Sequence, residues 1–366
     1  MKSRQSTASK KSGRPAVLSP AVAARIREAI VSGHWQPGDR LPTRRELCVS
    51  FDCSTITLQM AMNMLASERF ICSNGRRGTF VAERPPHLTE VAVVFPAPPV
   101  ESNHFWVAID NTIKHATFGD VVLSSWYGVE RREDNPVYCA LCERVRQGSL
   151  AGLLFVTSPF GFLKSPLLLE RPDIPRVAFA SDWQHAGVQL STIGFNHVSF
   201  AERAVERLAR QNCRRVAVVT YPDDGHEAWR AIARRHGLEL RPYWYQGVSQ
   251  ISPGTGRNLA RLLFRDGQVD RPDAVIVADD NLLEPIALGI RDAKMRVPRD
   301  VVVVSHCNFP WPTRSVVPVI RLGWDTRGIL ELALDMLKHV RGRSLAKKTS
   351  VDAVFEEELS TIDQPR

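Results

Sequence analysis

The stretch LPTRRELCVSFDCSTITLQMAMNMLASERFICSNGRRGTFV, residues 41–81, decides how the N-terminal part of the chain folds. Thr43 has Glu46 three residues after it, which is the spacing of a capping box at the start of a helix. A tight turn follows, and Ser54 is the natural N-cap of the next helix. The stretch therefore predicts two helices in close succession, joined by a short turn.

The second of these helices has an apolar face and a polar start. Leu58, Met62 and Leu65 recur at helical spacing and predict the face that packs against the core. Polar side chains remain near the N-terminal end, at Thr55, Thr57 and Gln59. A helix, a short turn and a second helix with polar residues at its start is how proteins place a helix in the major groove of DNA.

A hairpin is expected after the helices, with strands at residues 70–72 and 79–81 and a tip at residues 74–78. Arg76 and Arg77 at this tip suit a contact with phosphate or with the minor groove. The stretch as a whole predicts a winged helix-turn-helix. Its candidate DNA-binding residues are Arg44, Arg45, Ser54, Thr55, Thr57, Gln59, Arg76, Arg77 and Gly78.

Three motifs in this region carry a family resemblance. GHWQPGDRLPTRREL, STITLQMAMNMLASERFI and GRRGTFVA resemble the winged-helix domain of the GntR (gluconate-repressor) family of bacterial transcription regulators, over roughly residues 18–82. The resemblance implies DNA binding. The sequence departs from the family pattern at Thr55 and Gln59, where members usually carry arginines, and its wing holds one additional arginine.

The positive charge of the chain is concentrated in this N-terminal part. Residues 1–90 carry 14 Lys and Arg against 7 Asp and Glu, and the remaining residues carry 34 against 32, for a formal net charge of +9. Such an excess is the electrostatic footprint that nucleic acid requires. We expect residues 1–17 to form a disordered basic tail, which is either merely solvated or a non-specific DNA arm.

The composition of the chain indicates in which cellular compartment the protein works. The seven cysteines are odd in number and lack the spacing of a disulfide framework, which indicates a reducing environment. The basic N-terminus has no apolar segment behind it, and no run approaches the ~18 apolar residues of a membrane span. The sequence therefore predicts a cytoplasmic protein with no membrane partner. Cys139 and Cys142 form a lone C-x-x-C, and without a second ligand pair we expect neither a metal nor a cofactor.

From residue 90 onward, short apolar runs typical of buried strands alternate with helical patterns. Strands are expected at residues 91–95, 121–125, 152–156, 176–180, 215–220, 239–243, 274–278 and 301–305. Helices are expected at residues 104–117, 136–147, 198–211, 227–236, 256–265, 282–293 and 326–340. Such alternation builds parallel sheets covered by helices. The length favours two α/β lobes, with a ligand crevice outside the carboxyl ends of the strands.

The fold class predicted is thus α/β, an N-terminal winged helix-turn-helix followed by a two-lobed domain with parallel sheets. The boundaries expected are a tail at residues 1–17, the winged helix-turn-helix at 18–83, a proline-containing linker at 84–89, and a two-lobed effector-binding and dimerisation domain at 90–366.

A second resemblance supports this expectation. PDAVIVADDNLLEPIALGIRDAKMRVPRDVVVVS and IGFNHVSFAERAVERLARQNCRRVAVVT are similar to segments of the ligand-binding domain of the lactose/galactose-repressor (LacI) family. The resemblance implies a periplasmic-binding-protein-like fold, in which two lobes hinged by crossing strands bind a small molecule and dimerise.

The same resemblance implies where an effector binds. Asp279 and Asp280 match the family's Asn-Asp after a core strand, where a carboxylate accepts hydrogen bonds from ligand hydroxyls or amines. Capping the following helix is an equal alternative for Asp280. The family's ligand-gripping arginine falls at Gly225, and its aspartate after the last core strand falls at Cys307.

Aromatic residues near the predicted strand ends either stack on a sugar ring or fill the core. The candidate effector-binding residues are Phe95, Phe105, Trp126, Asp182, His226, Asp279, Asp280 and Asn308.

The sequence predicts a ligand-responsive transcription regulator, with repression relieved by ligand as the expected polarity. A homodimer places two winged helices on a pseudo-palindromic operator in double-stranded DNA, with a carbohydrate or similar small molecule as effector. Arg44 and the wing contact phosphate, and Arg45 leads the residues that read bases. No catalytic residues are expected, because nucleophile elbows, H-E-x-x-H and phosphate-cradling glycine loops are missing from the sequence.

Two other functions fit parts of the sequence. One is an architectural DNA-binding repressor whose second domain serves only dimerisation, which the departures at Gly225 and Cys307 favour. The other is a solute-binding protein for a transporter, which the winged helix disfavours.

Overall fold

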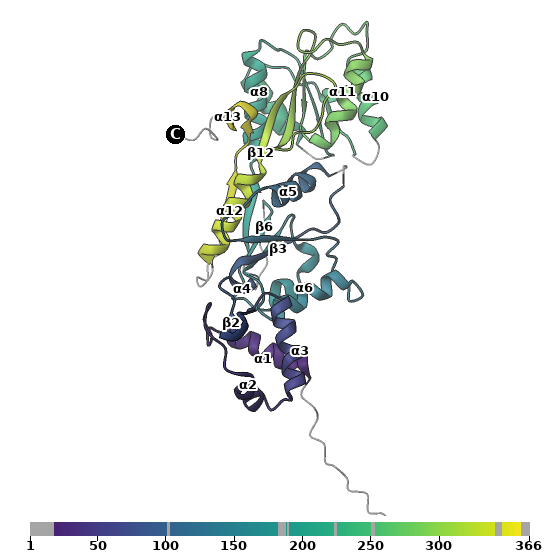
Figure 1. The fold of residues 1–366 in the computed structure, drawn as a ribbon. Coiled ribbons are helices and arrows are strands. Elements are labelled where there is room, and N and C mark those ends of the chain that lie inside the picture. Colours follow the sequence, from purple (N-terminus) through teal and green to yellow (C-terminus); the bar gives the residue numbers. More distant parts are fainter. Residues whose placement is uncertain are drawn as a thin grey trace, which may run out of the picture. The chain divides into compact units, whose positions relative to one another are not determined.

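The computed structural model describes residues 18–100, 103–181, 188, 190–222, 225–249, 253–340 and 346–359 (Figure 1). The chain divides into two compact units. The first is the part up to Glu90 together with Ala140–Ala151, and the second is Val91–Cys139 together with the chain from Gly152 onward. The predicted tail at residues 1–17 lies outside the described residues.

The first unit contains the predicted helices and hairpin. Its elements are α1 (Ser19–Val31), α2 (Arg44–Phe51), α3 (Thr55–Ser67), β1 (Ile71–Ser73), β2 (Thr79–Val81) and the short α4 (Pro86–Thr89), with a 3-10 turn at Gly75–Arg77 between the strands. The capping box of α2 is confirmed, because the Thr43 side chain accepts a hydrogen bond from the Glu46 N–H and the Glu46 side chain accepts one from the Thr43 N–H. Ser54 is confirmed as the N-cap of α3.

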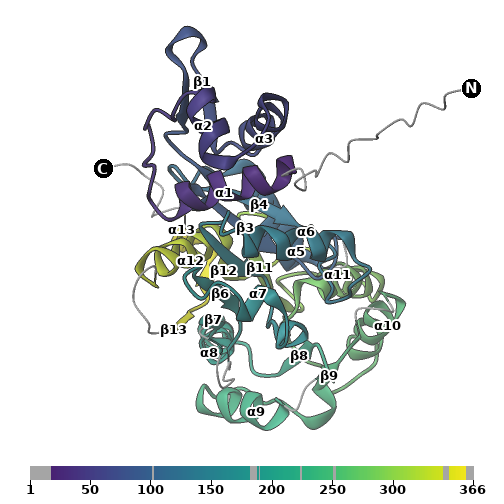
Figure 2. The same ribbon diagram turned by 90° about the horizontal axis from the view of Figure 1, so that it is seen from below.

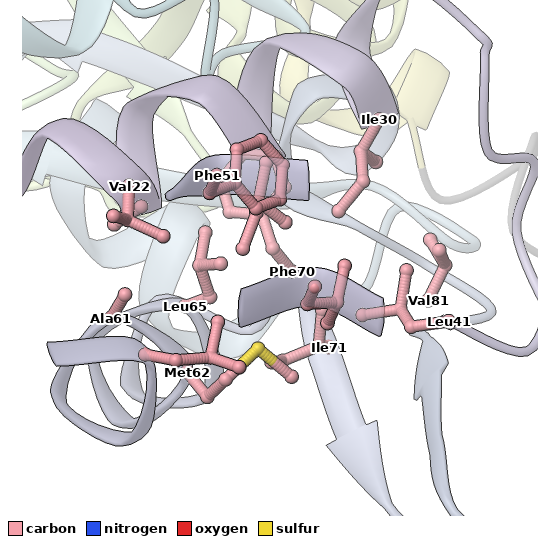
Figure 3. Packing of buried hydrophobic residues seen from close by; sticks show 14 residues of the cluster. Val22, Ile30, Leu41, Phe51, Ala61, Met62, Leu65, Phe70, Ile71 and Val81 are labelled. Atoms are coloured by element: carbon pink, nitrogen blue, oxygen red, sulfur yellow. The ribbon is translucent and has the colours of Figure 1, made fainter. Parts of the chain in front are cut away.

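A single hydrophobic cluster holds this unit together (Figure 3). Figure 3 shows side chains of α1, α3 and the hairpin pointing toward one another, with Phe70 between them. Leu41 is buried in this cluster, and Trp35 packs against it. The buried stripe predicted for α3 is therefore confirmed.

The start of α1 differs from expectation. The pair Ser19-Pro20 predicts a helix with Ser19 as N-cap and Pro20 as its first residue, but the helix begins at Ser19 and Leu18 is the N-cap. The extended backbone of Leu18 places its carbonyl where it accepts hydrogen bonds from the N–H groups of Ala21 and Val22. The Ser19 side chain makes no cap, so proline at the first turn, and not a hydroxyl, marks this helix start.

The second unit is built on two six-stranded sheets. The first has the order β13-β7-β6-β5-β3-β4. Its strands are β3 (Glu90–Val94), β4 (Val122–Trp126), β5 (Gly152–Phe155), β6 (Arg176–Phe179), β7 (Ser191–Phe195) and β13 (Lys348–Val351), and the helices that follow its strands are α5 (His104–His115), α6 (Pro136–Arg146) and α7 (Pro166–Leu169). The pairs β3–β5, β5–β6, β6–β7 and β7–β13 are parallel.

The second sheet has the order β14-β12-β11-β10-β8-β9, and all its pairs but β12–β14 are parallel. Its strands are β8 (Val216–Thr220), β9 (Tyr245–Gly247), β10 (Ala274–Val277), β11 (Val302–Phe309), β12 (Ile320–Asp325) and β14 (Val354–Phe355). The accompanying helices are α8 (His197–Arg210), α9 (His226–Arg235), α10 (Pro253–Leu263) and α11 (Leu283–Asp292). Figure 1 shows α8 on one side of this sheet and α10 and α11 on the other.

The chain passes between the two sheets after β7, after β12 through α12 (Thr326–Val340), and again after β13. A short α13 (Glu356–Leu359) ends the described chain. Two parallel sheets joined by repeated crossings are the architecture predicted from the sequence, so the α/β fold class is confirmed.

One predicted strand is wrong and several were missed. The strand expected at residues 239–243 is replaced by β9, because Pro242 lacks the N–H that a ladder needs and begins a 3-10 turn at Pro242–Trp244. Glu239 makes only an isolated bridge with Arg215. The strands β7, β12, β13 and β14 were not predicted. β12 was missed although Ile320, Leu322 and Trp324 alternate with non-apolar residues, and β14 is only two residues long.

Candidate DNA interface and effector site

The first candidate surface lies across α2 and the start of α3, which Figure 2 shows from below. Arg44 and Arg45 occupy the first turn of α2 and both are exposed. A shallow groove of about 880 Å³ opens beside them, and its lining residues are Arg44, Arg45, Cys48, Val49, Asp52, Cys53, Ser54 and Thr55. The α2–α3 turn is closed by Asp52 in the left-handed conformation at φ +48, so it presents the N-terminal end of α3 beside two cations.

The predicted polar residues of α3 have different neighbours. Ser54 Oγ accepts a hydrogen bond from the Thr57 N–H at 3.0 Å and lies 2.8 Å from the Thr57 hydroxyl, so both hydroxyls take part in the cap. Gln59 donates to Asn63 Oδ1 at 2.8 Å along the same helix. Thr55 is exposed, with its side chain beside the groove.

The wing carries three exposed arginines, one of which the sequence reasoning missed. Arg76 and Arg77 lie in the 3-10 turn at the tip. Gly78 has φ +114, a backbone conformation that favours glycine, and the Arg40 side chain lies beside it, with Nε 2.9 Å from where a Cβ would be. Arg40 pairs with Phe80 as an isolated bridge next to the hairpin. Arg40 directly follows the turn Pro37-Gly38-Asp39 in the sequence, but its spacing from the hairpin does not predict that it lies beside the wing.

The outward face of α3 carries exposed apolar side chains that were not predicted from the sequence. Ile56 and Met60 are exposed there, as is Val49 on α2. They lie opposite the buried stripe, at a spacing of four residues on α3, so a helical count from Leu58 would have found them.

The second candidate site is a buried polar cluster around Asp280, just after β10. The Asp280 side chain accepts a hydrogen bond from Asn308 Nδ2 at 2.8 Å and lies 3.4 Å from His306 Nδ1. Burial opposes ionisation of Asp280, but the charge of His306 and the hydrogen bond from Asn308 help outweigh it, so the pKa of this carboxyl is lowered from its ordinary value of 3.8. The structure therefore keeps a carboxylate in a water-poor position.

The cluster lies where the two halves of the second unit meet. His104, at the start of α5, has its ring Nδ1 3.2 Å from the Asp280 carbonyl oxygen and 3.0 Å from the Thr313 hydroxyl. The His104 N–H donates to Asn281 Oδ1 at 2.8 Å. A helix of the first sheet thus reaches the carboxyl ends of β10 and β11 in the second sheet, which is where ligands bind in open α/β folds.

Three buried polar atoms in this region have no hydrogen-bond partner among the described residues: His306 Nε2, Asn308 Oδ1 and Trp324 Nε1. The His306 ring lies 4.8 Å from the Trp324 ring. Buried donors and acceptors are almost always satisfied in folded proteins, so unpartnered ones near a buried carboxylate indicate a place for a polar ligand or water.

Aromatic rings from both halves surround the cluster. Phe105 of α5 packs edge-on against Phe195 with ring centroids 5.3 Å apart, and Phe195 packs against Trp324 at 5.0 Å. Phe179 lies 6.0 Å from Phe105, and Phe200 lies 5.9 Å from His306. An aromatic wall beside paired polar groups is the surface on which a sugar ring stacks.

The remaining predicted effector residues lie in various places. Phe95 is fully buried and packs against Tyr127, and Trp126 Nε1 donates to Ser124 Oγ at 3.2 Å. His226 begins α9, with its Nδ1 3.4 Å from Glu227 and its Nε2 buried without a partner among the described residues. Asp182 lies outside the described residues.

Asp279, and not Asp280, takes the capping role that was weighed for this position. Its side chain accepts hydrogen bonds from the Asn281 N–H at 3.0 Å and from Asn281 Nδ2 at 2.7 Å. The Asp280 side chain is left to the buried cluster.

Two further sequence expectations concern metals and membranes. In the described part of the chain, no group of three or more His, Cys, Asp and Glu residues could hold a metal ion. Within the same ranges, no helix has the length and hydropathy needed to cross a bilayer.

Comparison with known proteins assigns both parts of the chain. Residues 18–81, which span the three helices and the wing, match the bacterial regulatory proteins of the gntR family. Residues 205–354 match the periplasmic binding protein-like domain. The chain joins a GntR-type DNA-binding domain to a periplasmic-binding-protein-like domain. Both predicted resemblances are confirmed, and with them the prediction of a DNA-binding transcription regulator.

Relatives of this regulator include repressors of sugar metabolism. The arabinose metabolism transcriptional repressor of Geobacillus stearothermophilus is 22% identical over 349 residues, which cover 90% of this chain and 92% of the relative. The ribose operon repressor of Escherichia coli (strain K12) is 22% identical over 247 residues, which cover 65% of this chain and 72% of the relative.

A solved structure has the same fold over the second domain. The LacI family transcriptional regulator from Lactobacillus casei with bound glucose is 18% identical, with a TM-score of 0.50. The match covers 73% of this chain and 98% of that one. The periplasmic-binding-protein-like fold of this regulator is therefore supported by its topology and by a known structure.

Proposed function

We propose that this regulator is a repressor controlled by a sugar or sugar-like effector. The single observation that carries the proposal is the buried cluster of Asp280, His306 and Asn308, which joins a carboxylate to unpartnered polar atoms at the carboxyl ends of parallel strands. The protein we propose is cytoplasmic. Its GntR-type domain binds an operator in double-stranded DNA.

The cluster has the chemistry that a polyol needs. A carboxylate is an acceptor with about four lone-pair positions, and Asn308 and Thr313 occupy only part of this capacity. A sugar hydroxyl donates to such a carboxylate and accepts from a ring N–H. Trp324 and the phenylalanines offer a face for the C–H side of the ring. Relatives named for ribose and arabinose repression support this chemical class.

The DNA-binding half divides into positioning and reading residues. Arg44, Arg76 and Arg77 are exposed cations that contact phosphate, and the backbone at Gly78 allows the wing to approach the duplex. Ser54 anchors the start of α3. Base edges are read by the remaining predicted residues, which are Arg45, Thr55, Thr57 and Gln59.

A homodimer fits this scheme, because a two-fold pair of winged helices reads a pseudo-palindromic operator. Effector binding shifts the equilibrium between two arrangements of the pair, with a coupling free energy of roughly 1–3 kcal/mol. Ligand-relieved repression is the polarity we propose. No step of this scheme requires catalysis, and the ribose and arabinose relatives are repressors.

One observation favours a second function, in which the domain of parallel sheets serves only dimerisation. Cys307 stands where the family resemblance implies an aspartate, and its side chain is buried among β-strands. Burial raises the pKa of the Cys307 thiol well above its ordinary value, so this group stays neutral and cannot replace a carboxylate.

Isothermal titration calorimetry on the full chain separates the two functions. A panel of aldopentoses, aldohexoses and sugar acids is titrated into the wild type, into Asp280→Asn and into the control Asp266→Asn, an exposed surface change. We expect saturable heat with at least one compound, abolished in Asp280→Asn and kept in the control. Absence of heat with every compound would favour the dimerisation scaffold.

A further inference from the structure

The outward face of α3 carries exposed apolar side chains that packing within the first unit does not explain. Ile56 is 75% exposed and Met60 is 55% exposed, and Val49 at the edge of the neighbouring groove on α2 is 78% exposed. Burying the apolar surface of a side chain lowers the free energy by roughly 25 cal/mol per Å² removed from water. Apolar groups gathered on a binding face therefore indicate a partner that covers them.

Helical geometry shows that this face is separate from the core. The core-facing side of α3 is made of Leu58, Ala61, Met62 and Leu65, all buried. Ile56 and Met60 lie one helical turn apart on the opposite side. Asn63 and Ser67, which continue that side toward the C-terminal end, are polar and exposed. The apolar pair is thus confined to the N-terminal half of the helix, the half that a helix-turn-helix presents to base edges.

The charges around this pair indicate what covers it. Arg44 and Arg45 stand at the start of α2, and Arg76 and Arg77 stand on the wing of the same unit. Exposed cations on both neighbouring elements favour a polyanion over an apolar protein surface. DNA is a polyanion that also offers an apolar group in its major groove, the C5-methyl of thymine.

We propose that Ile56, assisted by Met60, reads thymine methyl groups in the operator. This inference rests on the proposed DNA-binding function and adds the source of part of its base specificity. The helix α3 (Thr55–Ser67) contains no arginine or lysine, so this helix offers no guanidinium to guanine. Apolar contact with thymine takes the place of that contact.

The experiment removes the methyl and nothing else. Full-length protein enriches a duplex from a random-sequence library, and each thymine of that duplex is then replaced singly by deoxyuridine. Deoxyuridine keeps every hydrogen-bonding group of thymine and lacks only the methyl. Burial of one methyl corresponds to about fourfold in affinity, so we expect about a fourfold rise in Kd at one or more positions and no change at thymines outside the footprint.

Variants assign the effect to a side chain. Ile56→Ala is expected to bind the unmodified duplex about fourfold more weakly and to lose its sensitivity to deoxyuridine at one position. Met60→Ala should do the same at a neighbouring position. Val269→Ala, which truncates a 92% exposed apolar side chain in the other unit, is the matched control and keeps the full deoxyuridine penalty. Both α3 positions are exposed, and thermal unfolding of each variant verifies its fold.

The outcomes separate this inference from the function on which it rests. If the protein enriches no duplex from the library at low ionic strength, both DNA binding and the thymine contact are overturned. A duplex that binds but tolerates every single deoxyuridine within about twofold would leave the regulator in place and overturn the thymine contact. The thymine contact is also overturned, and the regulator left in place, if Ile56→Ala and Met60→Ala both retain the wild-type deoxyuridine penalty.

Discussion

A carboxylate removed from water stays charged only where other charges and donors replace that water. Asp280 is 1% exposed and has such replacements in His306, Asn308 and the Thr313 hydroxyl. Replacing one carboxylate oxygen by an amide NH2 removes the charge and leaves a donor facing one of these groups. The residue is therefore expected to matter for stability as well as for ligand binding.

We expect Asp280→Asn to remove an acid-sensitive part of the stability. A carboxyl whose folded pKa is lowered stabilises the fold fully above its unfolded value near 3.8, and loses this contribution as pH falls through the folded value. Urea unfolding followed by tryptophan fluorescence should show the wild type more stable by roughly 3 kcal/mol at about pH 5.

The difference between wild type and Asp280→Asn should shrink as the pH falls below about 3.8 and the wild-type carboxyl takes up its proton. Asp266→Asn, at an exposed position, should show no such difference. A stability gap that stays constant down to the lowest pH measured would show that Asp280 is not held as a carboxylate.

Arg45 is the arginine to which base reading is assigned. It lies exposed on the first turn of α2 beside the groove that leads to α3. We expect Arg45→Ala to weaken specific operator binding by ~1–3 kcal/mol while non-specific binding changes far less. Arg210→Ala removes an equally charged side chain that is 70% exposed in the other unit, and it should leave the gel-shift affinity unchanged. Operator affinity that is the same for Arg45→Ala and Arg210→Ala would refute the assignment.

At the scale of elements, the wing combines a positive-φ glycine with a cluster of cations. The Arg40 side chain lies next to Gly78, and Arg76 and Arg77 occupy the tip. Cations on a short rigid hairpin reach phosphate without reading sequence. The wing should therefore set the strength of binding, and α3 its selectivity.

We expect the pair Arg76→Ala/Arg77→Ala to flatten the salt dependence of binding for any DNA sequence. Removing one phosphate contact lowers the slope of log K against log salt by about 0.9, so the pair should lower it by about 1.8. Arg230→Ala/Arg234→Ala on α9 removes the same charge from the other unit and serves as the control. If both pairs have the wild-type slope in titrations by fluorescence anisotropy, the wing does not contact phosphate.

Elements with strong local signals were predictable from the sequence, and the others were not. The helices capped by Thr43 and Ser54 were predicted because side-chain caps are encoded within a few residues. The apolar strands β5, β8 and β10 were predicted because they are buried on both faces. In contrast, β13 and β14 depend on pairing with distant strands, because β13 has a single aliphatic residue, Val351, and β14 is only two residues long.

The candidate effector site was predictable only in part for the same reason. The resemblance placed Asp280 and Asn308 in the right neighbourhood of the chain, and the structure joins them at 2.8 Å. Trp324 and His104 could not be found in this way. They come from β12, which was not predicted, and from a helix that belongs to the other sheet. Contacts across such sequence separations are set by topology, and no local pattern records them.

At the scale of the whole molecule, regulation requires that effector and operator influence each other's affinity. Thermodynamic linkage makes this influence reciprocal, so the factor by which effector changes operator affinity equals the factor by which operator changes effector affinity. This equality holds whatever the arrangement of the two units. Measuring both factors therefore tests whether the two units form one regulator.

We expect saturating operator duplex to weaken effector binding by about 5-fold to 150-fold in calorimetry, the range of a 1–3 kcal/mol coupling. The same factor should appear when operator affinity is measured with and without saturating effector. Arg76→Ala/Arg77→Ala, titrated at a duplex concentration that it does not bind, should keep the effector affinity of the free protein. Effector affinity that is indifferent to bound operator would mean that the two domains share a chain without controlling each other, because a ligand shifts an equilibrium only by its differential affinity for the two states.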